Sequence, residues 1–169
     1  MNRLDRQGKA RCFIEGKEEE IEIAGERTGV KALKLGGHFP GSLAVLAFGR
    51  LLVADTLVTT PAGLGDWSLG AGGGKDARPR GMNSYSFMWS IPNMIPLTPE
   101  EVQGMWDVLK GHEFESTHGA FVGAEVRDGG GGSEKGVKER VLESMQIQVR
   151  NMGWSEHKLL KEVVEEVEL

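Results

Sequence analysis

The sequence predicts an α/β fold in which helices cover one face of a mixed sheet, and two patterns support this prediction. Alternating and continuous apolar runs of strand length follow one another up to residue 56. Further along, segments 96–111 and 137–152 carry apolar residues at helical spacing. Because such helices have an apolar stripe to bury, we expect them to pack against the sheet. The length of 169 residues predicts one domain over residues 1–169.

The expected strands come first along the chain. Residues 11–14, 20–23 and 29–35 are short runs, and the sequence EIEI at 20–23 alternates between apolar and charged residues. Residues 43–48 and 51–56 are nearly continuous apolar runs joined by a Gly-Arg pair. Such runs predict an antiparallel pair deep in a sheet, connected by a tight turn.

The first helix has strong boundary signals. Over residues 96–111, Thr98 is in position to act as the N-cap, Pro99 occupies the first helical position and Glu101 completes a capping box. Residues 113–122 follow this helix and predict a short strand that ends near His118.

The C-terminal part predicts two more helices over residues 137–169. Segment 137–152 is amphipathic, and Ser155 is expected to cap a last helix that continues to the end of the sequence. Residues 61–97 contain four of the six prolines and are expected to be irregular. Their aromatic part, 83–97, predicts either a loop folded onto the core or the lining of an apolar pocket.

Composition excludes several classes of protein. The net charge of −5, from 20 basic and 25 acidic residues, disfavours a nucleic-acid-binding protein, which normally has a basic face. No apolar run approaches the ~20 residues that cross a bilayer, and the first residues lack the apolar core of a secretory signal. The single cysteine cannot form an intrachain disulfide, which fits a reducing compartment. We therefore expect a cytoplasmic protein that binds neither membranes nor nucleic acid.

Three residues are candidates for chemistry. His38, Asp55 and His118 lie next to apolar strands, the two histidines beside glycines in GGHFPG and STHGAF and the aspartate at the end of LLVAD. Polar residues at strand ends are where sites are often built. Two imidazoles and one carboxylate suit a first-row metal such as zinc, manganese or iron. The alternative is structural: Asp55 caps a turn and His38 bonds a backbone carbonyl.

The other two histidines have simpler interpretations. His157 lies near the start of a charged helix and is expected to be exposed. His112 follows the first helix, where it can act as a capping cation. His112 is also the rival of His118 for the last ligand position, but a strand precedes His118 and a glycine follows it.

The stretch GGHFPGSLAVLAFGRLLVADTL resembles the middle of the metallo-β-lactamase-fold hydrolases, which carry a GH-x-PGS segment, a strand pair and a GDTL-like turn. The strands before it and EEVQGMWDVLKGHEFESTHGAF after it resemble the neighbouring parts of that family, so the similarity spans residues 11–128. The resemblance implies that His38, Asp55 and His118 are metal ligands. It also implies that Asp55 is the bridging, catalytic carboxylate.

One family motif is absent. The metal-binding sequence H-x-H-x-D-H does not occur in the chain, and about ten residues precede the first matched strand. We therefore expect half of the αββα sandwich, a mixed sheet covered by helices, with His38 and His118 facing different ions and Asp55 between them.

Two functions follow from this resemblance. One is a metal-dependent hydrolase, in which a metal-bound hydroxide attacks an ester, thioester or lactone bond of a small-molecule substrate. The alternative is a non-catalytic relic or binding module that keeps the core of the fold without its complete metal site. A half-fold would also leave one sheet face uncovered, which predicts a homo-oligomer.

Overall fold

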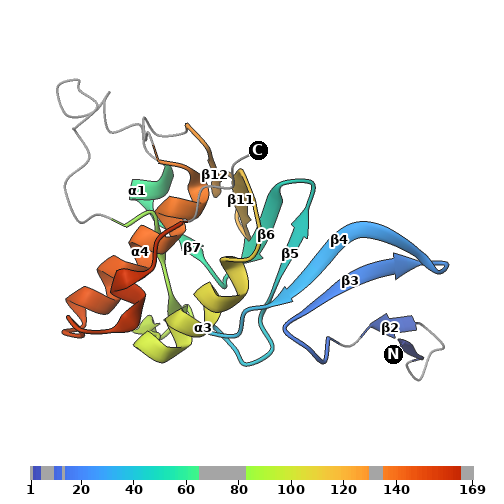
Figure 1. Cartoon of the computed structure of the whole chain (residues 1–169), viewed down its shortest axis with the longest axis horizontal. Coiled ribbons are helices and arrows are strands. Elements are labelled where there is room, and N and C mark those ends of the chain that lie inside the picture. Colours follow the sequence, from blue (N-terminus) through green and yellow to red (C-terminus); the bar gives the residue numbers. More distant parts are fainter. Residues whose placement is uncertain (1, 5–9, 13, 65–82, 130–134, 165–169) are drawn as a thin grey trace.

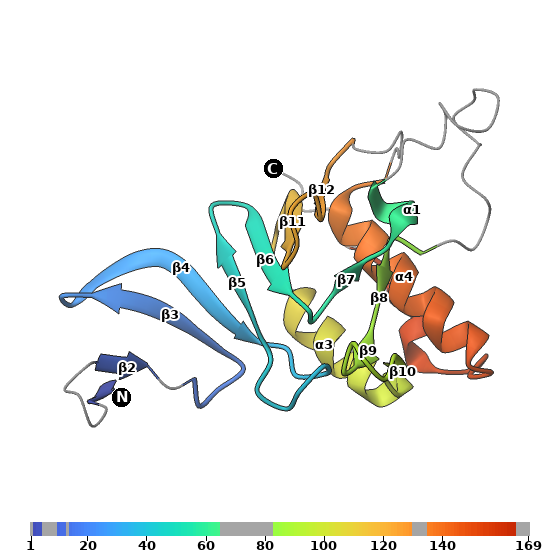
Figure 2. The same cartoon turned by 180° about the vertical axis from the view of Figure 1, so that it is seen from behind.

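The computed structural model describes residues 2–4, 10–12, 14–64, 83–129 and 135–164. Its centre is a six-stranded mixed sheet with the strand order β12-β11-β6-β5-β4-β3 (Figures 1 and 2). All neighbouring strands are antiparallel except β6 and β11, which run parallel. The six strands are β3 (Glu18–Ile23), β4 (Glu26–Lys34), β5 (Leu43–Ala47), β6 (Arg50–Ala54), β11 (Ser116–Gly119) and β12 (Glu125–Arg127).

The predicted central strand pair is confirmed. β5 and β6 are antiparallel, with Val45 opposite Leu52 and Ala47 opposite Arg50. Residues along β6 alternate between exposed and buried, so this strand has one face in the core and one face outside. The α/β class and the mixed sheet predicted from the sequence are therefore confirmed.

Two helices cover one face of this sheet: α3 (Pro99–Leu109) and α4 (Val137–Asn151). The predicted capping box of α3 is present, because Thr98 Oγ1 accepts the Glu101 amide at 3.3 Å while Glu101 Oε2 accepts the Thr98 amide at 2.9 Å. Figures 1 and 2 show α3 and α4 on the same side of the molecule. Apolar residues of the two helices and of β4–β6 form one core, including Leu33, Leu51, Val53, Val102, Met105, Trp106, Val141, Met145 and Val149.

The other face of the sheet remains exposed. Leu43 and Leu52 keep 39% and 46% of their surface accessible, and Val45 is half-buried. These three residues share one face, since Val45 pairs with Leu52 and lies two positions from Leu43. We call them the open sheet face. In the predicted homo-oligomer, a second copy of the chain would cover this surface.

The segment expected to be irregular contains several short elements. α1 (Pro61–Leu64) follows β7 (Val58–Thr59), which pairs with β8 (Tyr85–Ser86), and β9 (Met88–Trp89) pairs with β10 (Ile95–Pro96). Tyr85, Phe87 and Met88 are buried, so the part around β8 and β9 folds onto the core. At the N-terminus β1 (Asn2–Leu4) pairs with β2 (Ala10–Cys12), so the predicted 11–14 strand is shifted, and residue 13 lies outside the described residues.

The prediction of a last helix from Ser155 onward is wrong. The chain forms only the 3₁₀ turn η2 (Lys158–Lys161), capped by His157, and Glu162 is already extended; residues 165–169 lie outside the described residues. Long-range contacts explain the difference, because they hold this segment in a conformation that its local sequence does not favour.

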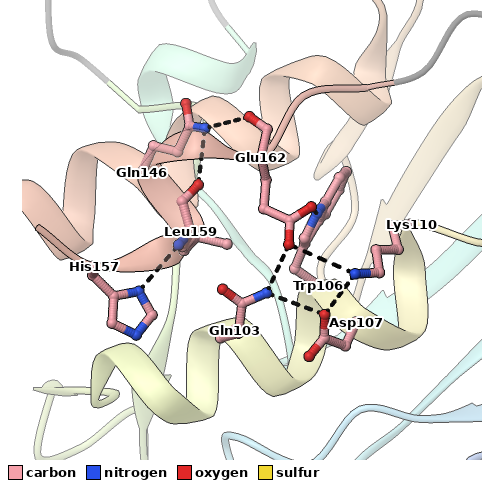
Figure 3. Close-up of polar contacts among 8 residues, drawn as sticks. All are labelled: Gln103, Trp106, Asp107, Lys110, Gln146, His157, Leu159 and Glu162. Atoms are coloured by element: carbon pink, nitrogen blue, oxygen red, sulfur yellow. Dashed lines mark hydrogen bonds and ion pairs between the residues drawn. The ribbon is translucent and has the colours of Figure 1, made fainter.

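Those contacts join the C-terminal segment, residues 158–164, to both helices (Figure 3). The Glu162 carboxylate accepts hydrogen bonds from Gln103 Nε2 at 3.2 Å and from the buried Trp106 indole at 3.3 Å. Gln146 of α4 donates through Nε2 to the backbone oxygens of Leu159 at 3.1 Å and Glu162 at 2.9 Å. A regular helix through Glu162 would require its carbonyl and side chain to leave these partners.

Candidate functional site

The topology brings the three candidate residues to one end of the sheet. β6 and β11 are parallel neighbours, with His118 opposite Leu52 and Gly119 opposite Ala54. Asp55 directly follows β6, so it lies at the end where β11 also finishes. Because β5 runs antiparallel to β6, the β4–β5 loop that carries His38 lies at this end too, as Figure 2 shows. We call this the ligand edge of the sheet.

The His38 side chain is buried and held in one orientation. It is 6% exposed, and its Nδ1 lies 2.9 Å from the backbone oxygen of Met88. A carbonyl oxygen can only accept a hydrogen bond, so Nδ1 carries the proton and donates. The lone pair is then on Nε2, which is the tautomer that a metal-binding histidine with this kind of support adopts.

The loop around His38 depends on local sequence. Ser42 accepts the amides of Leu35 and Gly36 with its carbonyl, both at 3.1 Å, and accepts the Phe39 amide with its hydroxyl at 2.9 Å. Gly37 adopts φ +75°, and a Cβ there would come within 2.8 Å of the Leu97 side chain. Gly37 and Ser42 are therefore required by the turn that presents His38.

Asp55 occupies a strained turn after β6. The preceding residue, Ala54, has φ +45°, a left-handed conformation uncommon for a residue with a side chain. The Thr56 amide closes the turn on Val53 O at 2.9 Å. Asp55 is half-buried and forms no hydrogen bond or ion pair with another described residue, so the structure offers no contact that would make it a turn cap.

His118 lies on the exposed side of β11. Its side chain is 31% accessible, and Nε2 is 3.1 Å from Ser116 Oγ and 3.6 Å from Glu125 Oε1 on β12. The Arg127 guanidinium beside Glu125, 2.6 Å away, lowers the pKa of that carboxyl and keeps it ionised. One nitrogen of His118 is thus fixed by neighbours, while Nδ1 forms no hydrogen bond with the described residues.

The residue before His118 anchors β11 in the core. Thr117 is fully buried, and its hydroxyl lies 2.7 Å from the hydroxyl of Tyr85 on β8. Burial raises the pKa of Tyr85 to about 12, with the hydrogen bond to Thr117 and the charge of Arg140 opposing the increase. The strand that carries His118 and the segment that supports His38 are therefore joined by a neutral buried hydrogen bond.

The three candidates do not form a ready-made metal centre. Among the residues that the structure describes, no group of three His, Cys, Asp or Glu side chains is placed to hold one ion. Two hollows of about 410 and 440 Å³ lie elsewhere, on either side of residues Glu162–Val164, and none of the three candidates lines them. The ligand edge gathers suitable donors in one region without enclosing a site.

The remaining histidines have partners of their own. The His112 ring is buried, and its Nε2 pairs with Glu18 Oε2 at 2.9 Å, while its amide donates to Leu109 O. His157 uses Nδ1 to accept the Leu159 amide at 3.3 Å and is partly buried rather than exposed as expected. Of the four histidines, His38 and His118 are the two at the ligand edge.

Polar residues on α4 were missed by the sequence reasoning. Arg140, Ser144 and Gln148 recur at four-residue spacing, and the first two are 2% and 0% exposed. They bond the segment that leads to Met88, the partner of His38. The available signal was a polar stripe at helical spacing beside the apolar one, which ordinarily indicates a solvated face.

Comparison of the chain with protein-family models, curated proteins and solved structures finds no match in any of the three. None of the helices in the described part of the chain has the length and apolar composition needed to cross a membrane.

Proposed function

We propose that this protein is a metal-dependent hydrolase of the metallo-β-lactamase fold, whose described sheet and helices correspond to one half of an αββα sandwich. The observation that supports this best is the ligand edge. His38, Asp55 and His118 are separated by 17 and 63 residues of sequence, yet the pairing of β6 with β11 and with β5 places all three at one end of the sheet. The order of these residues matches the resemblance drawn from the sequence.

The donor types at this edge fit a first-row metal. His38 would offer Nε2, because its Nδ1 donates to Met88, and Asp55 would offer a carboxylate that no described residue occupies. His118 would be the third ligand. When bound, zinc, manganese or iron supplies a hydroxide nucleophile at neutral pH. The protein's own contribution is to orient the donors.

His38, Asp55 and His118 alone do not make a complete metal site. They are not grouped around one point among the described residues, and the H-x-H-x-D-H motif that would supply further ligands does not occur in the sequence. This observation favours the second candidate function, a non-catalytic binding module that retains the core of the fold. Metal binding by the full chain separates the two.

Exposed apolar side chains beside His38 are consistent with a small apolar substrate. Phe39 packs edge-on against the His38 ring at 4.6 Å and remains 51% exposed. Trp89 follows Met88, the partner of His38, and is 43% exposed. An ester, thioester or lactone with an apolar group would find contact surface there. A homo-oligomer through the open sheet face and a cytoplasmic location complete the proposal.

The test is the metal content of the purified full chain and its zinc affinity by calorimetry. Asp55→Asn is the most informative variant, since the new side chain is nearly isosteric and Asp55 forms no hydrogen bond or ion pair with a described residue. We expect near-stoichiometric zinc, manganese or iron in the wild type and loss of binding in Asp55→Asn and His38→Ala. His157→Ala, which changes a histidine outside the ligand edge, is the matched control. A protein that is metal-free and remains so in added zinc would establish the binding module instead.

A further inference from the structure

We infer that Gln148 on α4 is a positioning residue for His38, acting through the backbone of Phe87 and Met88. This inference rests on the proposed function insofar as His38 is a metal ligand. The positioning of the imidazole, however, can be measured without metal.

The segment 84–88 obtains few of its hydrogen bonds from strands. β8 and β9 pair for two residues each, with β7 and β10, and neither belongs to the six-stranded sheet. A buried backbone must nevertheless bond its amides and carbonyls. In this segment the amides of Ser84, Tyr85 and Phe87 are bonded by side chains of α4.

Three side chains on one face of α4 form hydrogen bonds with segment 84–88. Arg140 donates through Nε to Ser84 Oγ at 3.1 Å, and Ser144 Oγ accepts the amides of Ser84 and Tyr85 at 2.9 and 3.2 Å. Gln148 Oε1 accepts the Phe87 amide at 3.2 Å. From Ser144 to Gln148 the helix rises about 6 Å, and the two residues of extended chain from Tyr85 to Phe87 advance about as far, so both side chains reach the segment.

Gln148 makes the contact nearest to His38. Besides accepting the Phe87 amide, it donates through Nε2 to Phe87 O at 3.0 Å and to Leu97 O at 3.3 Å. Gln148 therefore bonds both peptide units that flank Phe87, and the Phe87 carbonyl also accepts the Leu97 amide at 3.1 Å. The next carbonyl along the chain is that of Met88, which accepts the proton of His38 Nδ1. Gln148 thus helps to orient the chain that leads to that carbonyl and, through it, to select which nitrogen of His38 is free.

A purely structural role for Gln148 is the alternative, and the same helix provides the control. Gln146 also uses Nε2 to donate to two backbone carbonyls, those of Leu159 and Glu162. Both glutamine side chains are partly buried. The important difference is the target, because Gln146 holds the C-terminal segment and Gln148 holds the support of His38.

The experiment compares Gln148→Met with Gln146→Met in the metal-free full chain, by the nitrogen-15 chemical shifts of the His38 imidazole at alkaline pH. The signal is assigned by its absence in His38→Ala. We expect the wild type and Gln146→Met to show the Nδ1–H tautomer and Gln148→Met to show averaged tautomers. Zinc affinity should fall about tenfold in Gln148→Met alone, the lower end of the effect known for residues that support metal ligands.

Equal responses of the two variants, or an unchanged His38 signal in Gln148→Met, would overturn the inference. If Gln148→Met does not fold, Gln148→Glu serves, because it keeps the acceptor for the Phe87 amide and loses the donation to the two carbonyls; the same tautomer change is expected. Absence of zinc binding in the wild type would refute the proposed function and leave the tautomer comparison valid.

Discussion

The pH dependence of stability provides a sharp prediction, because Tyr85 is the only tyrosine of the chain. Its side chain is fully buried and its hydroxyl is bonded to Thr117. Removal from water raises the pKa of Tyr85 from the ordinary 10.0 to about 12. Tyrosinate formation in the folded protein should therefore lag behind that of an unfolded chain by about 2 pH units.

The size and sign of the effect on folding follow from proton linkage. A phenol whose pKa is higher in the folded state contributes stability that is fully present below pH 10 and is lost as the pH rises towards 12. One pKa unit corresponds to about 1.4 kcal/mol, so the full loss is about 2.7 kcal/mol. A decrease of that size is a large part of the stability of a typical domain.

The assay combines ultraviolet absorbance of tyrosinate with urea unfolding at increasing pH. Tyr85→Phe is the control, because it removes the whole tyrosinate signal and should remove this component of the alkaline destabilisation. A titration midpoint near 10 under conditions where the protein is folded would show that Tyr85 is accessible to water. The packing of β8 against β11 would then be incorrect.

Three substitutions test other parts of the structure. Gly37→Ala should lower the free energy of unfolding by about 1–3 kcal/mol, because the new Cβ requires a left-handed backbone and meets Leu97; urea denaturation measures it. Glu162→Ala should cost about 1–2 kcal/mol and alter Trp106 fluorescence, since the indole N–H loses its acceptor. Leu52→Lys should shift the protein from oligomer to monomer in light scattering without lowering stability, because Leu52 is 46% exposed on the open sheet face.

Each of these has a clear opposite outcome. Unchanged stability of Gly37→Ala would mean that the His38 loop is not constrained as described. Unaltered fluorescence in Glu162→Ala would place the C-terminal segment elsewhere. A wild-type protein that is already monomeric would remove the need for a partner on the open sheet face.

Local signals in the sequence were sufficient for the parts of the fold that local contacts determine. The capping box at Thr98 and Glu101 involves residues three apart, and the structure contains it. The β5–β6 pair is joined by a tight turn, so its pairing could also be predicted from the sequence. The prediction of the last helix failed because residues more than 50 positions away, such as Trp106, hold Glu162 in an extended conformation.

The candidate site was predictable only in part. Strand-end position singled out His38, Asp55 and His118, but their shared edge depends on β6 pairing with β11, which are separated by some 60 residues of sequence. The support of His38 was not predictable at all, because Gln148 reads as a surface residue until its partners Phe87 and Leu97 are known. Long-range pairing, rather than residue type, decides both features.

The most direct measurement is a zinc titration of the full chain, followed by the imidazole resonances of its four histidines. If the ligand edge is a coordination site, the signals of His38 and His118 shift together at the same zinc concentration, while those of His112 and His157 stay in place. Zinc that leaves both signals unmoved, or that moves His112 instead, would contradict the placement of the site at this end of the sheet.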